Sequence, residues 1–280
     1  AIPTPQGNFI INSNDIVLVS NTRDLIGRNN KKQNMSKVVE LFGNPLYYNY
    51  AETNDSTETE VRHNIQQLPG AEQEILELQA LLKSSGWTPE TFMEKTATEE
   101  RVKNLNNPKV FHIATHGFFM EDTYVDDKGT EGVVESKAIQ NPLLRSGLLL
   151  RNGGERIANN NVYEFNKEEG ILTAYEAMNL NLDNTELVVL SACETARGEV
   201  QLGEGVYGLQ RAFLVAGANS VVMSLFKVND QVTKELMVLF YKKWIATGNK
   251  RKAFTDAKKE IKEKYSDPLY WGAFVMIGLD

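Results

Sequence analysis

Cys193 is the residue whose chemistry the sequence makes easiest to interpret, because it is the only cysteine among 280 residues. It follows an uninterrupted apolar run at 187–190 and two small residues, Ser191 and Ala192. A short apolar run bounded by turn residues is typical of a strand buried on both faces. We therefore expect Cys193 at the carboxyl end of a central parallel strand, where open α/β sheets bind their ligands. A thiolate at that position is a competent nucleophile.

Two histidines lie in the second chemically informative stretch, Phe-His-Ile-Ala-Thr-His-Gly at residues 111–117. Its β-branched and aromatic residues before a glycine predict a strand. On a strand, His112 and His116 share a face but lie roughly 13 Å apart, at about 3.3 Å per residue. One ion cannot contact both, and the chain offers one cysteine and no third clustered ligand. We therefore expect neither a metal site nor a cofactor.

The alternative to a metal site is a pair of one histidine and one cysteine. His116 is predicted to close one strand and Cys193 another, and in a parallel sheet both ends lie at the same edge. If those strands are neighbours, the imidazole can take the proton of the thiol. Gly117 lets the backbone approach a substrate closely, and its N–H and that of Cys193 can stabilise an oxyanion. On this pattern alone, a buried packing cysteine and a structural histidine explain the residues equally well.

The charge and composition of the chain argue against several classes of function. A formal net charge of −7 argues against nucleic acid as a partner, because such a partner calls for a basic face. A single cysteine excludes an intramolecular disulfide framework and suits a reducing cytoplasm. No stretch approaches the roughly 20 apolar residues of a membrane span, and the start lacks the regions of a signal peptide. We expect a cytoplasmic protein without membrane contact and, because Met is absent at the start, a fragment of a longer chain.

The order of the predicted elements indicates an α/β fold. A helix beginning at Pro69 presents Ile75, Leu78 and Leu82 on one face. Strands and helices then alternate, which is typical of a parallel sheet with helices on its faces. The other expected elements are a strand pair within 8–20, strands at 38–41, 91–93, 110–115 and 220–226, and helices at about 206–215, 231–247 and 251–264.

Two capping boxes and two polar segments complete this interpretation. Thr96-Ala97-Thr98-Glu99 and Thr173-Ala174-Tyr175-Glu176 both have the Thr-x-x-Glu spacing that starts a helix. Residues 51–66 are polar and acidic without periodicity, as in an exposed loop. Residues 120–170 are rich in Asp, Glu, Asn and Gly apart from one apolar island at 148–150. We expect there a long insertion that contains a short strand or hairpin.

Several ordered motifs stand around and beyond both candidate residues. They are IATHGFF at 113–119, NPLLRSGL at 141–148, LSACET at 190–195, GEG at 203–205, the stretch 209–218, SLFKVND at 224–230 and YWGAF at 270–274. Together these motifs resemble the CHAT domain family. The resemblance covers most of the chain from about residue 69 onward and is weaker before it. One departure is Phe226-Lys227, where the family more often has Trp-Pro, in a strand that can line the primary specificity pocket.

The resemblance implies a caspase-like α/β/α sandwich with a mostly parallel central sheet. Residues 1–68 are then a degenerate or extended N-terminal half, and residues 69–280 form the peptidase core with its insertion at about 120–170. It implies His116 as general base or ion-pair partner, Cys193 as nucleophile, and the Gly117 and Cys193 amides as oxyanion donors. Family members usually carry tetratricopeptide repeats or other sensor modules ahead of the domain, which implies a regulatory partner and fits a fragment.

Two acidic residues are candidates for binding a basic substrate side chain. Asp230 lies shortly after the end of the strand predicted at 220–226, and Glu204 lies in the loop after Cys193. A structural explanation is at least as good for each. Asp230 suits the N-cap of the helix that follows, and Glu204 suits the first turn of a helix, where the dipole favours an acid.

These observations together predict a cysteine endopeptidase that cleaves a protein substrate through an acyl-enzyme at Cys193. The segments 120–170 and 194–205 are expected to shape the substrate cleft or to close it until a partner binds. Two alternatives remain open. One is a catalytically inactive CHAT module that binds proteins, and the other is a thiol amidase that acts on a small molecule.

Overall fold

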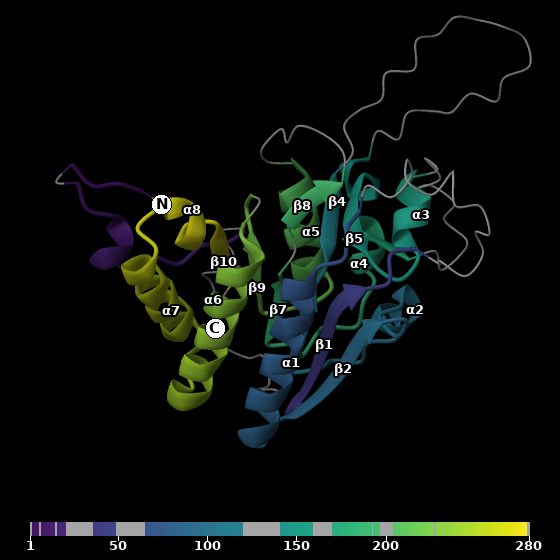
Figure 1. The fold of residues 1–280 in the computed structure, drawn as a ribbon, viewed down its shortest axis with the longest axis horizontal. Helices are drawn as coiled ribbons and strands as arrows, with labels where there is room; N and C mark the ends of the chain where they lie inside the picture. Colours follow the sequence, from purple (N-terminus) through teal and green to yellow (C-terminus); the bar gives the residue numbers. More distant parts are fainter. Residues whose placement is uncertain are drawn as a thin grey trace, which may run out of the picture.

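The computed structural model describes residues 2–5, 7–14, 16–20, 36–48, 65–119, 141–158, 170–191, 193–196, 204–226 and 228–278. Its largest feature is a six-stranded sheet with the strand order β10-β9-β7-β3-β1-β2 (Figure 1). The sheet consists of β1 (Val38–Pro45), β2 (Thr88–Glu94), β3 (Val110–Ala114), β7 (Leu187–Leu190), β9 (Ser220–Ser224) and β10 (Phe274–Gly278).

Helices cover both faces of this sheet and give three layers (Figure 1). The first layer packs on one face through side chains such as Leu78, Leu236 and Ala257, and the second packs on the other through Val102, Ala177 and Phe213. The first layer is α1 (Pro69–Ser84), α6 (Asp230–Thr247), α7 (Lys250–Lys264) and α8 (Pro268–Trp271), and the second is α2 (Glu99–Lys103), α4 (Ala174–Ala177) and α5 (Glu204–Val215).

The sheet is mostly parallel, as the sequence predicts. β1 pairs in parallel with β2 and β3, β3 with β7, and β7 with β9. Only β10 runs antiparallel to its neighbour β9 within the described sheet. The strands β3, β7 and β9 are buried along their whole length, which explains their continuous apolar sequences. β1 lies between β3 and β2, so residues 38–45 belong to the interior of the sheet.

A second, four-stranded sheet lies beyond the carboxyl ends of β3 and β7. Its strand order is β6-β5-β4-β8, and β4 and β8 directly follow β3 and β7 in the chain. The sequence predicts only one short strand or hairpin in this region, at 148–150, which corresponds to β5. The strands are β4 (His116–Phe119), β5 (Ser146–Leu149), β6 (Ile171–Thr173) and β8 (Cys193–Ala196), and the linking helices are η3 (Pro142–Leu144) and α3 (Gly153–Ala158).

The two predicted capping boxes differ in outcome. The box at Thr173 is confirmed, because its hydroxyl accepts from the N–H of Glu176 while the Glu176 carboxylate accepts from the N–H of Thr173. The helix that it starts has only four residues. The other prediction is wrong by two residues, since Thr98 caps α2 and the Thr96 hydroxyl bonds with the backbone of Met93. The turn after β2 thus uses Thr96 before the helix begins.

The strand pair predicted within 8–20 is also wrong. This segment forms the short helix η1 (Ile10–Asn12) and two isolated bridges, Pro3 with Phe9 and Leu18 with Ile277. Phe9 packs edge to face on Trp271, at 4.9 Å between ring centroids, so the apolar side chains contact α8 instead of a partner strand. Among the described residues, no helix is both long and apolar enough to cross a membrane.

Candidate active site

The pairing of β4 with β8 brings the backbones of His116 and Cys193 together. The two strands are parallel neighbours, and His116 is the register partner of Cys193. Adjacent strands lie about 4.8 Å apart, so the two residues are opposite each other across the ladder. The side chain of Cys193 lies outside what the structure describes. The proposed pair requires that the strands of His116 and Cys193 are neighbours, and the pairing of β4 with β8 meets this requirement.

Neither residue closes a strand of the main sheet, which corrects the sequence interpretation. His116 opens β4 after a break at Thr115, and Cys193 opens β8 two residues after Ser191. The break has a physical reason, because the Thr115 hydroxyl donates to the carbonyl of Leu149 at 2.5 Å. That hydrogen bond directs the chain from the main sheet toward β5, which pairs with β4.

The imidazole of His116 is held by a backbone carbonyl. Its Nε2 lies 2.8 Å from the carbonyl oxygen of Gln66, in the segment that leads into α1. A carbonyl oxygen can only accept, so Nε2 carries the hydrogen and Nδ1 is the basic nitrogen of the neutral ring. The ring is buried, with 5% of His116 exposed. This contact fixes both the orientation and the tautomer of His116.

Tyr47 supports His116 from β1's side of the site. The two ring centroids are 5.0 Å apart, and the backbone N–H of His116 donates to the Tyr47 hydroxyl. That hydroxyl in turn donates to Thr115 Oγ1 at 3.0 Å, since the Thr115 proton is used on Leu149. Burial raises the pKa of Tyr47, and the charge of Asp230 adds to the rise. Tyr47 is therefore a neutral phenol that orients the backbone of His116.

Asp230 lies close to this group of residues, but it is not the cap of α6. Asn229 is the N-cap, because its Oδ1 accepts from the N–H groups of Gln231 and Val232 at 3.0 and 3.2 Å. Asp230 is the first residue of the helix and is exposed. A Cβ added at Gly70 would lie 2.7 Å from the Cβ of Asp230, so the start of α6 contacts the start of α1. Its N-cap explanation is wrong, and its contact with substrate stays a hypothesis.

The remaining predicted site residues are located only by their backbones. Gly117 lies inside β4, with Leu148 and Glu194 as its register partners on either side. Glu204 is the first residue of α5, and its side chain lies outside the described structure. Residues 120–140, 159–169, 197–203 and 227 also lie outside it, so the expected cleft-shaping segments are not described there.

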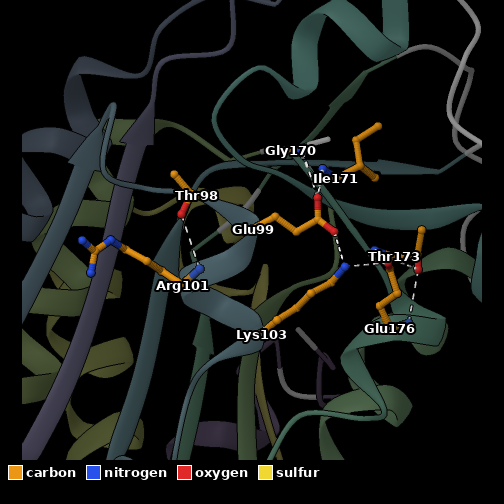
Figure 2. A network of polar contacts seen from close by, with 8 residues as sticks. All are labelled: Thr98, Glu99, Arg101, Lys103, Gly170, Ile171, Thr173 and Glu176. Carbon is orange, nitrogen blue, oxygen red and sulfur yellow. Dashed lines mark hydrogen bonds and ion pairs between the residues drawn. The ribbon is translucent and has the colours of Figure 1, made fainter. Parts of the chain in front are cut away.

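A polar cluster joins α2 and α4 to the small sheet (Figure 2). The carboxylate of Glu99, at the start of α2, accepts from the N–H groups of Gly170 and Ile171 at 2.9 and 3.2 Å. Lys103 Nζ contacts both Glu99 and Glu176. Burial raises the pKa of Glu99, and the hydrogen bond from Lys103 opposes that rise. The cluster fixes the start of β6 and, through β5, the strand that carries His116.

Sequence reasoning missed Gln66, Tyr47 and Glu74, for different reasons. Gln66 acts through its backbone, which no side-chain pattern reveals. Glu74 lies on the same helical face as Ala71 and Leu78, where an acid among apolar residues signals a buried partner. Its partner is His112, whose Nε2 lies 2.8 Å from Glu74 Oε1. Within the described part of the chain, no three His, Cys, Asp or Glu side chains gather closely enough to hold a metal ion.

The layered architecture defines a caspase-like α/β fold. The same arrangement is found in a solved structure of the Arg-specific cysteine proteinase gingipain R, with a TM-score of 0.50 and 9% sequence identity. The match covers 88% of this chain and 48% of that one. At this identity the likeness concerns the fold alone.

The chain belongs to the CHAT domain family, whose model matches residues 1–279. It is 28% identical over 219 residues to the mouse (Mus musculus) tetratricopeptide repeat protein 28, which is 76% of this chain and 9% of that protein. The human (Homo sapiens) protein of the same name is 28% identical over 230 residues, with 76% and 8% covered. The chain thus spans less than a tenth of the length of these curated relatives, and the resemblance noted in its motifs is confirmed.

Proposed function

We propose that this protein is a cysteine endopeptidase with Cys193 as nucleophile and His116 as its base. The observation that supports this function best is the parallel register of β4 and β8, in which His116 is opposite Cys193. The hydrogen bond from His116 Nε2 to the Gln66 carbonyl adds support, because it leaves Nδ1 as the proton acceptor. The caspase-like fold and the CHAT family are compatible with this chemistry.

The reaction follows from these roles. His116 Nδ1 takes the thiol proton, and the Cys193 thiolate attacks the carbonyl carbon of the scissile peptide bond. The carbonyl oxygen becomes an oxyanion that accepts hydrogen bonds from the amides of Gly117 and Cys193. As the C–N bond breaks, the imidazolium returns its proton to the leaving amine, which leaves a thioester. Water, activated by the same imidazole, then hydrolyses the thioester and regenerates the thiol.

The substrate and its regulation belong to the same proposal. Asp230 and Glu204 are the candidates for binding a basic side chain before the scissile bond, and Asp230 lies near enough to Tyr47 to raise its pKa. The relatives are named for tetratricopeptide repeats and are more than ten times longer than the matched part. A sensor module or partner protein therefore controls access to the cleft in this proposal, together with the segments 120–170 and 194–205.

The decisive experiment is cleavage of a fluorogenic peptide library by the wild-type protein, Cys193→Ala and His116→Ala. We expect cleavage by the wild type and its loss in both variants, each measured below its own unfolding temperature. Peptides with a basic residue before the cut should be preferred, and Asp230→Asn should reduce that preference. Cleavage that persists in Cys193→Ala would refute the assignment of the nucleophile.

Alkylation of Cys193 separates the proposal from a binding module without turnover. Iodoacetamide should react with Cys193 at neutral pH faster than with free cysteine, and His116→Ala should abolish the difference. Ordinary thiol reactivity combined with no peptide cleavage would favour an inactive CHAT module. Cleavage of small amides but of no peptide would favour a thiol amidase.

A further inference from the structure

A buried chain of polar side chains lies behind the proposed active site. Its four members are nearly inaccessible to solvent. They are Glu74 of α1 (2% exposed), His112 of β3 (0%), Ser191 just after β7 (8%) and Tyr241 of α6 (0%). Glu74 Oε1 lies 2.8 Å from His112 Nε2, and Glu74 Oε2 accepts from the Ser191 hydroxyl at 3.0 Å. His112 Nδ1 lies 3.1 Å from the Tyr241 hydroxyl. The proposed reaction uses none of these four side chains.

Ser191 is the member of this chain of contacts that matters for chemistry, because only Ala192 separates it from Cys193 in the sequence. Its N–H donates to the Ile113 carbonyl of β3 at 2.9 Å, which continues the pairing of β7 with β3. Its hydroxyl donates to Glu74. The backbone and the side chain of Ser191 are thus fixed to two different elements just before β8 begins.

The carboxylate of Glu74 is held by two donors, one on each of its oxygens. One oxygen serves His112 and the other serves Ser191, so the carboxylate has one orientation that satisfies both donors. The Tyr241 hydroxyl fixes the far side of the His112 ring. Burial raises the pKa of Tyr241, with Glu74 adding to the rise, so Tyr241 remains a hydroxyl. A buried polar group that loses its partner is costly, which keeps the whole arrangement in place.

We propose that Glu74 is a positioning residue for Cys193 and acts through Ser191. The inference rests on the proposed function and adds a residue of α1 to it. The hydrogen bond from Ser191 to Glu74 sets where β8 starts, and this start determines the register that brings Cys193 opposite His116. The segment that leads into α1 also holds His116 through the Gln66 carbonyl. One stretch of chain, residues 66–74, therefore contacts His116 directly and also contacts Ser191, two residues before Cys193.

The first test is the kinetics of Glu74→Gln, Ser191→Ala and the double variant on the best library peptide. A misplacement of about 1 Å near a reacting group reduces rates by about 100-fold. We expect kcat to fall by about 10- to 100-fold in each single variant, with KM changed by less than about threefold. The double variant should lose no more than the worse single variant, because both changes remove the same contact, the hydrogen bond from the Ser191 hydroxyl to the charged Glu74 carboxylate. If the kcat loss of the double variant equals the product of the two single losses, Glu74 does not act through Ser191, and the proposal is overturned.

Glu40→Gln is the matched control, because it makes the same carboxyl-to-amide change at a partly buried position. Glu40 lies on β1, next to Glu90 and Arg101, and does not take part in the contacts of Ser191. We expect its kcat to stay within about twofold of the wild type. Tyr241→Phe keeps the Glu74–Ser191 hydrogen bond and should reduce kcat less than Glu74→Gln. An equal loss in the control and in Glu74→Gln would overturn the proposal.

The second test does not depend on turnover. Amide hydrogen exchange of a peptide that covers residues 190–196 should accelerate at least about tenfold in Glu74→Gln and in Ser191→Ala, but not in Glu40→Gln. Should Glu74→Gln fail to fold, Ser191→Ala carries the test, since it leaves Glu74, His112 and Tyr241 in contact. Unchanged exchange and unchanged kcat in a folded variant would overturn the positioning role. If the wild type cleaves no peptide but both variants still exchange faster than the wild type, the proposed function is refuted. The role of Glu74 in positioning residues 190–196 then still stands.

Discussion

At the scale of single residues, the tautomer of His116 is decided by one backbone oxygen. The Gln66 carbonyl requires a hydrogen on Nε2, and the Tyr47 hydroxyl accepts from the His116 N–H. No carboxylate is needed for this orientation, because a carbonyl dipole and a neutral phenol suffice. A carbonyl stabilises an imidazolium less than a carboxylate does, since it carries only a partial charge. In the proposed reaction, His116 therefore moves a proton at each step instead of keeping a permanent ion pair.

Glu40 gives a prediction about pH at the same scale. Burial raises the pKa of the Glu40 carboxyl from 4.5 to about 7, and its register partner Glu90 on β2 adds to the rise. The folded protein therefore binds more protons than the unfolded chain between these values, and the free energy of unfolding falls as pH rises through them. Above pH 7 the wild type carries a destabilising charge that Glu40→Gln lacks.

We expect Glu40→Gln to be more stable than the wild type at pH 8 by on the order of 1 kcal/mol, a value reduced for solvent screening. The difference should vanish near pH 4, where both side chains are neutral. Urea unfolding at pH 4, 6 and 8 measures it, and Glu100→Gln, at an exposed position on α2, provides the reference. A difference that does not change with pH would contradict the raised pKa.

At the scale of elements, local sequence patterns predict the positions of helices and strands. They do not predict which distant segments pair with each other. The Thr173–Glu176 box was predictable, because both of its hydrogen bonds join residues three apart. The small sheet was not, since β4, β5, β6 and β8 each have three or four residues and come from separate parts of the chain. Cys193 and His116 were recognisable by type and motif, but their register depends on that sheet. Nothing in the sequence marks Gln66 as the acceptor for His116.

The Glu99 cluster provides the prediction for this scale (Figure 2). Glu99→Ala leaves the N–H groups of Gly170 and Ile171 without their acceptor and Lys103 without one of its two carboxylates. Because these groups are buried, we expect a loss of about 2–4 kcal/mol in the free energy of unfolding. Urea denaturation measures the loss, and hydrogen exchange should show it first at residues 170–173.

Glu100→Ala is the matched control for the Glu99 prediction. Glu100 is the next residue of α2 and is exposed, so its removal alters only the first-turn charge, worth about 0.5 kcal/mol. Equal destabilisation by both variants would mean that helix charge, and not the acceptor for β6, explains the effect of Glu99.

At the scale of the whole molecule, both ends of the described chain meet beside the outer strand β10. Leu18 forms a bridge with Ile277, and the N–H of Gly278 donates to the carbonyl of Leu18 at 3.0 Å. Phe9 packs on Trp271, and Lys262 Nζ lies 5.0 Å from the centre of the Phe9 ring. In Figure 1 the N-terminal segment lies next to α7 and α8, away from the strands that carry His116 and Cys193. The segment therefore stabilises the edge of the fold and not the proposed active site.

Phe9→Ala tests this separation between the edge of the fold and the active site. It removes the ring that contacts Trp271 and Lys262, and we expect a loss of about 1–3 kcal/mol in the free energy of unfolding. Limited proteolysis should then cut within residues 2–20 at least about tenfold faster, because the segment loses its ring contact with Trp271 and keeps a few smaller contacts, such as those of Ile11, Asn12 and Leu18. Peptide cleavage below the unfolding temperature should stay within about twofold of the wild type. Ile2→Ala, at a side chain that is 60% exposed, is the control and should change none of these. A parallel loss of peptide cleavage in folded Phe9→Ala would show that the N-terminal segment is coupled to His116 and Cys193 through the sheet, contrary to its position at the far edge.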